Sequence, residues 1–396
     1  MILTFDMYQT VAIAVLVWAL GVFLKKRFQF LDTFCIPAPV VGGVLFSLIV
    51  TLLKDVAFKE ITFDGTLQMF FMMIFFTTIG FTANIRLLKK GGIQVITFLL
   101  VASLLVVLQN SLGISIGKLF NLNPMISLSA SSVPMVGGHG TSGAFGPLFE
   151  SLGATGATTV AMASATFGLV MGSLIGGPIA RRRINMYNLK STQEDVELSL
   201  DHDANKAKPL SKDNMLIGFA QIFLALGIGT IMSKVLNMSG LTFPVYIGSM
   251  FGAAIIRNLA EYSGKFETRD EEISIIGDIM LTFFLVMALM TLKLWQLADL
   301  ALPLITILAG QTVLTAAVAY FICFKVMGSD YEAAVMSAGL CGFGMGATPN
   351  AMANMSALEH KYGPAPRAFF ILPIVGSLFI DFVNASMITF FMNVFK

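Results

Sequence analysis

Long apolar runs separated by short polar segments make up most of this chain. A helix of about 20 apolar residues is long enough to cross the ~30 Å hydrocarbon layer of a bilayer. Ten such runs lie near residues 8–24, 37–53, 67–88, 93–117, 154–180, 215–236, 242–257, 273–294, 301–325 and 366–394. The pattern predicts an all-α polytopic membrane protein with ten transmembrane helices.

Two further segments, about 125–150 and 331–358, interrupt this series with glycine and proline. Both are too apolar for surface loops and too short for two full crossings. Irregular backbone at membrane depth is tolerated only where protein or water covers it. We therefore expect each segment to form a re-entrant hairpin with a glycine-rich tip.

The basic residues indicate an orientation. If the amino terminus lies outside, nineteen of the 25 Lys and Arg residues fall in inside loops. They lie at 25–27, 86, 89, 90, 181–183, 190, 206, 208, 212, 257, 265, 269, 325, 361 and 367. This positive-inside bias favours ten spans with both termini outside and a cytoplasmic linker at 181–214.

The segments on either side of that linker contain similar short motifs. "APVVGGVL" at residue 38 corresponds to "FPVYIGSM" at 243, and "GGHGT" at 137 corresponds to "GMGAT" at 344. The chain is thus predicted to consist of one repeat at 1–180 and a second at 215–396. Because each repeat holds five spans, the second must be inverted relative to the first. Inverted repeats with broken helices that meet near the midplane are typical of secondary transporters.

The composition supports the membrane class and argues against an enzyme. Hydrophobic residues make up 56% of the chain and charged residues 12%, against about 25% charged in soluble domains. The net charge of +2 gives no indication of a nucleic-acid partner. The sequence shows no close carboxylate pair, metal-ligand cluster or nucleophile–base arrangement. We expect no catalytic residues and no organic cofactor.

The two tips are the candidate binding site. Glycine lets backbone turn sharply and approach a ligand closely, and a helix N-terminus presents N–H groups and a positive dipole end to an anion. Carbonyl oxygens at a helix C-terminus suit a dehydrated sodium ion. The predicted substrate-binding residues are Ser131, Ser132, Gly137, Gly138, His139, Gly140, Thr141, Ser142, Gly344, Gly346, Thr348 and Asn350. The structural alternative is that the glycines only permit tight packing and the polar side chains only cap the half-helices.

His139 is the one histidine predicted at membrane depth. It could contact a substrate carboxylate or carry a proton, or it could brace the tip as a hydrogen-bond donor. The second tip has no equivalent histidine. The sequence leaves these roles open.

Asp381 lies near the middle of the last span and is a functional candidate, because ionisable residues are costly inside a membrane. The predicted sodium site lies near Gly346, Thr348, Asp381 and Asn384. A hydrogen-bonded brace for the second hairpin is the alternative role of Asp381. Gln109 and Gln311 are expected to form hydrogen bonds between helices.

Gly168, Gly172 and Gly176 follow one another at four-residue spacing and so lie on one face of a helix. Small residues at this spacing allow another backbone to approach closely. We expect the hairpins to pack against this face.

Four stretches together resemble the bacterial sodium/glutamate symporter family: "VGGHGTSGAF", "GFGMGATPNAMANM", "IPAPVVGG" and "LPIVGSLFIDFVNA". The similarity covers essentially the whole chain. It implies sodium-driven uptake of glutamate across a bacterial inner membrane, with Na⁺ as the coupling ion. It also implies a fold related to the sodium/citrate carriers, a homodimer and an elevator-like movement.

Two other kinds of transport protein remain open at this point. A carrier of another dicarboxylate or a hydroxycarboxylate would share every physical feature described above. A channel could also use backbone carbonyls, but the two tips are unequal and oppositely directed, which favours a carrier.

Overall fold

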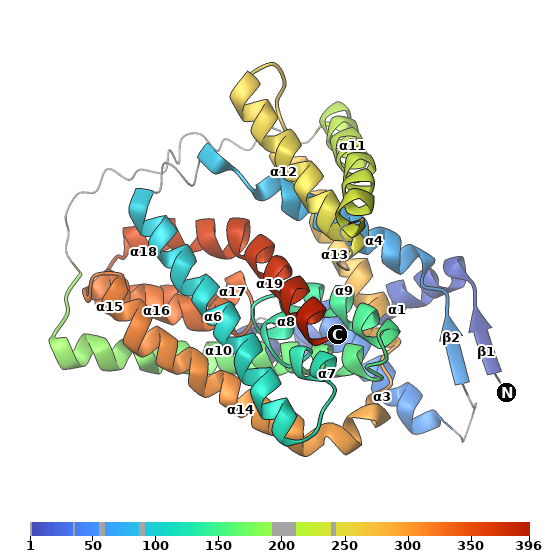
Figure 1. Cartoon of the computed structure of the whole chain (residues 1–396), viewed down its shortest axis with the longest axis horizontal. Coiled ribbons are helices and arrows are strands. Elements are labelled where there is room, and N and C mark those ends of the chain that lie inside the picture. Colours follow the sequence, from blue (N-terminus) through green and yellow to red (C-terminus); the bar gives the residue numbers. More distant parts are fainter. Residues whose placement is uncertain (1, 35, 55–59, 87–91, 192–210, 239–242) are drawn as a thin grey trace.

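The computed structural model describes all residues except 1, 35, 55–59, 87–91, 192–210 and 239–242 (Figure 1). From the amino terminus to the linker the elements are β1 (Ile2–Phe5), α1 (Met7–Arg27), α2 (Gln29–Thr33), α3 (Ala38–Leu53), β2 (Glu60–Phe63), α4 (Thr66–Thr82), α6 (Gly92–Leu119), α7 (Pro124–Leu128), α8 (Ser132–Met135), α9 (Gly138–Ser151) and α10 (Ala157–Tyr187). After the linker follow α11 (Lys212–Asn237), α12 (Val245–Ser263), α13 (Asp270–Met290), η1 (Leu294–Leu300), α14 (Ala301–Ala317), η2 (Val318–Cys323), α15 (Phe324–Val326), α16 (Tyr331–Gly344), α17 (Thr348–Tyr362), α18 (Pro366–Pro373), η3 (Ile374–Phe379) and α19 (Ile380–Phe395).

Each of the ten predicted apolar runs coincides with a helix or with a continuous series of helices. Among the described residues, six of these are by themselves long and apolar enough to cross a membrane: α1, α6, α10, α11, α13 and the series α14–α15. The pair α18–α19, bent by 42°, would be a seventh. α3 and α4 are apolar but shorter. The protein is therefore a multi-pass membrane protein.

The residues at the two ends of α1 show why such a segment forms a helix. The Asp6 side chain accepts from the Gln9 N–H at 2.8 Å, and the Gln9 side chain accepts from the Asp6 N–H at 3.1 Å. This reciprocal capping box satisfies two N–H groups at the helix start. Lys25, Lys26 and Arg27 occupy the last turn, where positive charge complements the helix dipole. Leu16, 70% exposed, is one of many large apolar side chains on the outside of the molecule, as expected for contact with lipid.

A short pair of parallel strands departs from the all-α expectation. Ile2 to Phe5 in β1 pair with Glu60 to Phe63 in β2, and the Phe5 and Phe63 rings stack with centroids 5.5 Å apart. Parallel strands need a long crossover connection, which here is formed by α1 to α3. Strands so far apart in sequence leave no hairpin signal.

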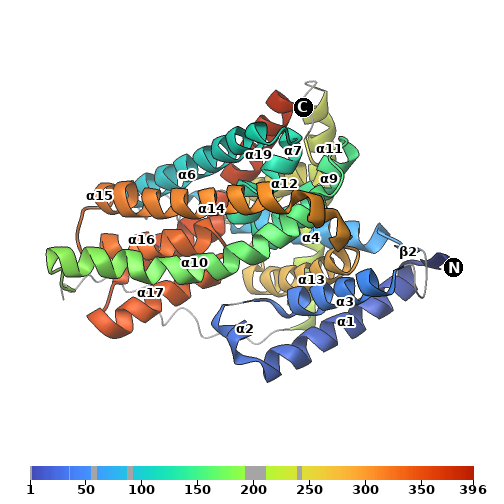
Figure 2. The same ribbon diagram turned by 90° about the horizontal axis from the view of Figure 1, so that it is seen from below.

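The helices form two bundles, each built from both halves of the sequence (Figures 1 and 2). We call α1, α3, α4, α11, α12 and α13 the frame bundle. The hairpin bundle comprises α6 to α10 and α14 to α19. Within the frame bundle helices touch at glycines: a Cβ atom on Gly80 would lie 2.3 Å from Met250 O, and one on Gly229 would lie 2.2 Å from Ser249 Cα.

The two bundles meet through aromatic side chains. The ring of Tyr246 in α12, which stacks within the frame bundle on Phe76 of α4 at 4.1 Å, meets Phe145 of α9 in the hairpin bundle edge-on at 5.9 Å. Phe251 of α12 and Phe382 of α19 have centroids 5.7 Å apart. Contact through side chains, rather than through interlocked backbones, distinguishes this boundary from the packing inside the frame bundle.

Candidate functional site

α10 positions both hairpins. At its start, the Thr158 N–H donates to the side chain of Glu150, at the base of the first hairpin. Beyond its end, the Ser191 hydroxyl donates to Pro364 O at 2.6 Å, at the base of the second hairpin. The hairpins thus approach the middle of α10 from its two ends.

The predicted glycine face of α10 packs against the second hairpin. A Cβ atom on Gly168 would lie 2.0 Å from Met345 O, at the tip between α16 and α17. A Cβ atom on Gly172 would lie 3.0 Å from Cys341 O, and one on Gly176 would lie 2.9 Å from Ala338 O. Only glycine allows this approach, so the expectation that a hairpin packs here is confirmed for the second hairpin.

The two tips touch each other. Gly138 has a φ of +59°, a left-handed conformation that favours glycine, at the point where α9 begins. A Cβ atom on Gly138 would lie 3.1 Å from the carbonyl oxygen of Gly346. Residues 208 positions apart in the sequence are therefore adjacent in space.

Two helices begin at this junction without a side-chain cap. Gly137 precedes α9, which has 14 residues, and Ala347 precedes α17, which has 15. Neither residue has a side chain that can accept a hydrogen bond from the first N–H groups. Pro349 occupies the second position of α17, so it leaves no N–H there to satisfy. The remaining N–H groups and the helix dipoles favour an anion at the junction.

The first hairpin carries a buried serine and amide cluster. The N–H and the hydroxyl of Ser132 both donate to Asn110 Oδ1 of α6, at 3.2 and 2.9 Å. Asn384 Nδ2 of α19 donates to Ser132 O at 3.3 Å. Ser131 instead turns back on its own segment and donates to Ser127 O at 2.7 Å. Asn384, predicted with the second tip, thus lies against the first hairpin.

The second tip is held by three other helices. Gln109 Nε2 of α6 donates to Gly344 O at 2.8 Å, and Thr348 Oγ1 donates to Gly376 O of η3 at 2.9 Å. Asn350 Nδ2 donates to Leu169 O of α10 at 2.8 Å. These contacts fix the turn between α16 and α17 on both sides.

The predicted hydrogen bonds of the two glutamines are confirmed. Besides bonding to the second tip, Gln109 accepts through its backbone carbonyl from Gln311 Nε2 of α14 at 2.9 Å. The two side chains therefore tie α6 to α14, one helix from each half of the sequence.

His139 is buried and bonded to α10. Its Nε2 lies 3.0 Å from Thr166 Oγ1, and the Thr166 hydroxyl lies 3.1 Å from Met162 O. A carbonyl oxygen can only accept, so Thr166 donates to it and accepts from the histidine. His139 therefore carries a proton on Nε2 and connects the first tip to α10.

The remaining residues of the first tip support it from within. The Ser142 hydroxyl donates to Gly138 O at 2.7 Å and lies 3.3 Å from Ala161 O. Thr141 is buried, and its side chain lies where a Cβ atom on Gly137 would be. Gly140 faces the frame bundle, since a Cβ atom there would lie 3.1 Å from Phe75 Cε1.

Asp381 is half-buried in the first turn of α19. Its carboxyl group makes no hydrogen bond or ion pair with any residue that the structure describes. Among the described residues, no three or more His, Cys, Asp and Glu side chains are placed so that they could hold a metal ion together. Any cation ligands at the tips must therefore come mainly from uncharged oxygen atoms.

Such oxygen atoms are present. Four buried amide oxygens have no hydrogen-bond partner among the described residues: those of Gln109, Gln311, Asn350 and Asn384. In each case the amide nitrogen donates to a backbone carbonyl, which can only accept, so the side-chain orientation is fixed. An acceptor left buried without a donor is costly, and a cation would satisfy it.

Asn110 shows the opposite arrangement and was missed by the sequence analysis. Its oxygen accepts from the Ser132 N–H, which can only donate, and its Nδ2 is buried without a partner in the described structure. A buried donor of this kind suits an anion. The available signal was an asparagine in the middle of the apolar run "VVLQNSLG".

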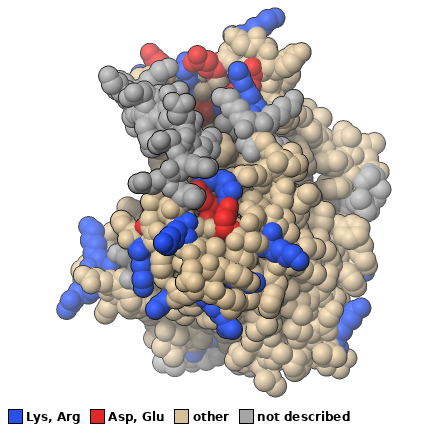
Figure 3. Space-filling view, turned by 90° about the vertical axis from the view of Figure 1, so that its left-hand side faces the viewer, with Lys and Arg blue, Asp and Glu red and all other residues tan. Residues whose placement is uncertain are grey.

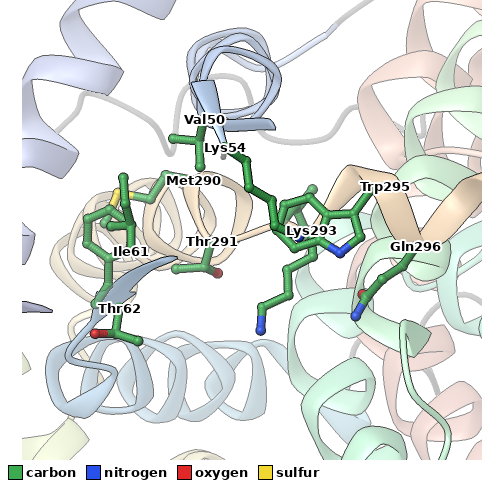
Figure 4. Close-up of a pocket in the computed structure, with 11 residues that line it drawn as sticks. Val50, Lys54, Ile61, Thr62, Met290, Thr291, Lys293, Trp295 and Gln296 are labelled. Atoms are coloured by element: carbon green, nitrogen blue, oxygen red, sulfur yellow. The ribbon is translucent and has the colours of Figure 1, made fainter. Parts of the chain in front are cut away.

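A cavity of about 500 Å³ lies away from the tips, between β2, the ends of α3 and α13, and η1 (Figure 4). Lys54 Nζ lies 3.8 Å from the centre of the Trp295 ring, a cation–π contact. Lys293, Thr291 and Gln296 also line the cavity. None of the residues predicted for substrate or sodium lines it.

Comparison with known proteins decides the family. The profile of the sodium/glutamate symporter family matches residues 3–364. The chain belongs to this family. A member of the sodium/glutamate symporter family is a transporter rather than an enzyme, and Na⁺ is its coupling ion.

Curated relatives agree over nearly the full length. The chain is 40% identical over 391 residues to a sodium/glutamate symporter of Haemophilus influenzae, covering 97% of this chain and 96% of the relative. It is also 40% identical over 390 residues to the sodium/glutamate symporter of Escherichia coli, covering 98% and 97%. The resemblance found from the sequence motifs is confirmed.

Proposed function

We propose that this protein carries glutamate together with sodium into the cell by alternating access, with the contact between the two hairpin tips as the binding site. Sodium-coupled symport of glutamate is the activity of its family. The observation that carries the assignment of the site is the convergence of two uncapped helix N-termini, those of α9 and α17, at Gly138 and Gly346.

This junction suits a dicarboxylate. Each helix start presents a positive dipole end to one carboxylate. In α17 the donor is the Thr348 N–H, because Pro349 has no N–H and the Asn350 N–H already donates to Ala347 O at 3.0 Å. The unpartnered Nδ2 of Asn110, beside Ser132 in the first hairpin, adds a third donor. In this proposal the predicted tip residues form the walls of the substrate site, and Asn110 joins them.

The coupling sodium ions bind the unpartnered amide oxygens. Asn384 is the first candidate, because it contacts Ser132 and lies one turn after Asp381, whose carboxylate supplies negative charge. Asn350 offers the equivalent oxygen at the second tip, beside Gly346 and Thr348. Sodium binding would thereby fix both hairpins before the substrate site is complete.

The proposed topology has ten spans in two inverted repeats, with residues 1–180 and 215–396 on either side of a cytoplasmic linker. The positive-inside distribution of Lys and Arg supports this orientation, with both termini outside. So does the approach of the hairpins from opposite ends of α10. We further propose the bacterial inner membrane as the location and a homodimer as the assembly, as the family resemblance implies.

Elevator-like movement of the hairpin bundle past the frame bundle would expose the tips alternately. In this structure Ser132, His139 and Asn350 are buried, whereas Gly138 and Thr348 are half-buried and Pro349 is exposed. Movement of the hairpin bundle would carry these partly accessible tips from one side of the membrane to the other. The aromatic contacts of Tyr246 with Phe145 and of Phe251 with Phe382 across the boundary support sliding, because side chains can exchange partners more easily than packed backbones.

The charge of glutamate sets a minimum number of sodium ions that must be transported with each substrate molecule. Moving one charge through 100 mV is worth about 2.3 kcal/mol. Glutamate carries a net negative charge, so at least two sodium ions per glutamate are needed for the membrane potential to favour uptake.

The test is uptake of labelled glutamate by proteoliposomes that contain the purified protein, with and without an inward sodium gradient. We expect accumulation only with the gradient, inhibited by unlabelled glutamate and not by citrate or malate. Stronger inhibition by citrate or malate would assign the site to another acid. Conductance without stoichiometric sodium flux would identify a channel instead.

A further inference from the structure

A groove between α10 and α17 lies at the end of the molecule where the second hairpin begins and ends. It has a volume of about 480 Å³. Its basic rim is formed by Arg181, Arg182 and Lys361. Its walls are formed mainly by Gly177, Pro178, Ala357 and Leu358. Lys and Arg side chains are prominent on this end of the protein (Figure 3).

No described acidic residue balances the charge of the rim. Among the residues that the structure describes, no Asp or Glu lines the groove, and Arg181, Arg182 and Lys361 form no ion pair. Two partly buried arginines elsewhere do form ion pairs: Arg257 with Glu261 and Arg367 with Asp330. The three basic side chains therefore leave a concentrated positive charge beside an apolar wall.

From the basic rim, the apolar wall continues along α10 toward its first residues. Pro178 and Ala357 are exposed. Leu174 lies one helical turn before Pro178 and is 50% exposed. The space beside Gly177 is open, since a Cβ atom placed there would meet no atom within 4 Å.

We propose that this groove binds an anionic phospholipid. The phosphate group lies between Arg181, Arg182 and Lys361, and an acyl chain follows the surface of Pro178 and Leu174. Arginine forms forked hydrogen bonds to phosphate, and basic residues near a membrane surface attract anionic lipid. A soluble phosphate compound would use the rim but would leave the apolar wall uncovered, which favours a lipid.

Native mass spectrometry of the purified full-length protein tests this proposal. Phosphatidylglycerol and, in parallel, phosphatidylcholine are titrated into the detergent-solubilised protein. We expect preferential retention of phosphatidylglycerol. Replacing two charges, Arg181→Gln with Arg182→Gln, should weaken retention about 25-fold, at about fivefold for each charge.

Two variants make the test specific. Lys26→Gln with Arg27→Gln removes two exposed charges from the end of α1, outside the groove, and should change retention less than about twofold, because exposed charges apart from the binding site are largely screened by salt. Gly177→Leu keeps every charge but fills the open space, and should abolish the preference for phosphatidylglycerol. Thermal unfolding of each variant in detergent checks that it is folded.

Three results would overturn the proposal. One is an equal loss of retention in the α1 variant, which would indicate general electrostatic attraction. Another is unchanged retention in Gly177→Leu. The third is displacement of phosphatidylglycerol by millimolar inorganic phosphate, which would indicate a site for a soluble anion.

Discussion

Gly138 of the first hairpin lies directly against the carbonyl oxygen of Gly346 in the second, so that a Cβ atom on Gly138 would stand 3.1 Å from that oxygen. This contact joins the two halves of the sequence at the middle of α10. It also brings together the starting ends of α9 and α17. The proposed binding site depends on this relationship, and the first prediction tests it.

Gly138→Ala should reduce glutamate uptake more than tenfold. Alanine at a φ of +59° costs roughly 1–2 kcal/mol, and its methyl group would press on the opposite tip. Gly153→Ala is the matched control, because Gly153 has a φ of +91° but a Cβ atom there would meet nothing within 4 Å. Initial uptake rates and thermal unfolding of both variants check this. Equal loss of uptake in both would mean that backbone strain alone is responsible.

Gly168→Ala should destabilise the protein and disable uptake. The added methyl group would overlap Met345 O, a backbone atom that cannot turn aside, and overpacking of this kind costs about 1–3 kcal/mol. Gly177→Ala on the same helix should behave like the unmodified protein, because space is open there. Melting temperatures in detergent distinguish the two. Similar melting temperatures would show that the tip can move away from α10 at little cost.

Asn384→Ala and Asn110→Asp should separate sodium binding from substrate binding. Loss of the Asn384 amide oxygen removes a cation ligand, so the sodium concentration for half-maximal uptake should rise roughly tenfold. Asn110→Asp keeps the acceptor for Ser132 but replaces the unpartnered donor with a negative oxygen. The KM for glutamate should then rise roughly tenfold at saturating sodium. The opposite assignment of the two effects would exchange the proposed roles.

His139 and Thr166 should act as a unit. The double variant His139→Ala with Thr166→Val should be no worse than the poorer single variant, because each change breaks the same hydrogen bond. The expected coupling is about 1 kcal/mol in thermal stability. A double-mutant cycle measured by unfolding gives this value. Additive effects would show that His139 acts outside this bond, as a substrate contact or proton carrier would.

A cross-link across the bundle boundary should block transport reversibly. Cysteines at Gly140 and Leu281 would join α9 to α13, where a Cβ atom on Gly140 would lie 3.9 Å from Leu281 Cδ1. Cysteines at Gly218 and Ile273 join two helices of the frame bundle and serve as the control. In a chain without its native cysteines, oxidation should stop uptake for the first pair only, and reduction should restore it. Uptake that continues with the first pair cross-linked would exclude movement between the bundles.

The sequence by itself determined the helices and their class. Runs of about 20 apolar residues have one stable form in a bilayer, because a helix satisfies all its backbone groups internally. All ten predicted runs are accordingly helical, and the segments about 125–150 and 331–358 form broken helical hairpins. Four motifs taken together, two of them around Gly138 and Gly346, indicated the family.

Only the tertiary structure decided how these helices group and which polar atoms lack partners. The sequence divides the chain at residues 181–214, whereas each bundle in space takes helices from both sides of that linker. The pairing of β1 with β2 was likewise invisible, because it joins strands more than 50 residues apart. Asn110 and Asn384 look alike in sequence. The opposite roles proposed for them rest on Ser132, which donates to Asn110 and accepts from Asn384.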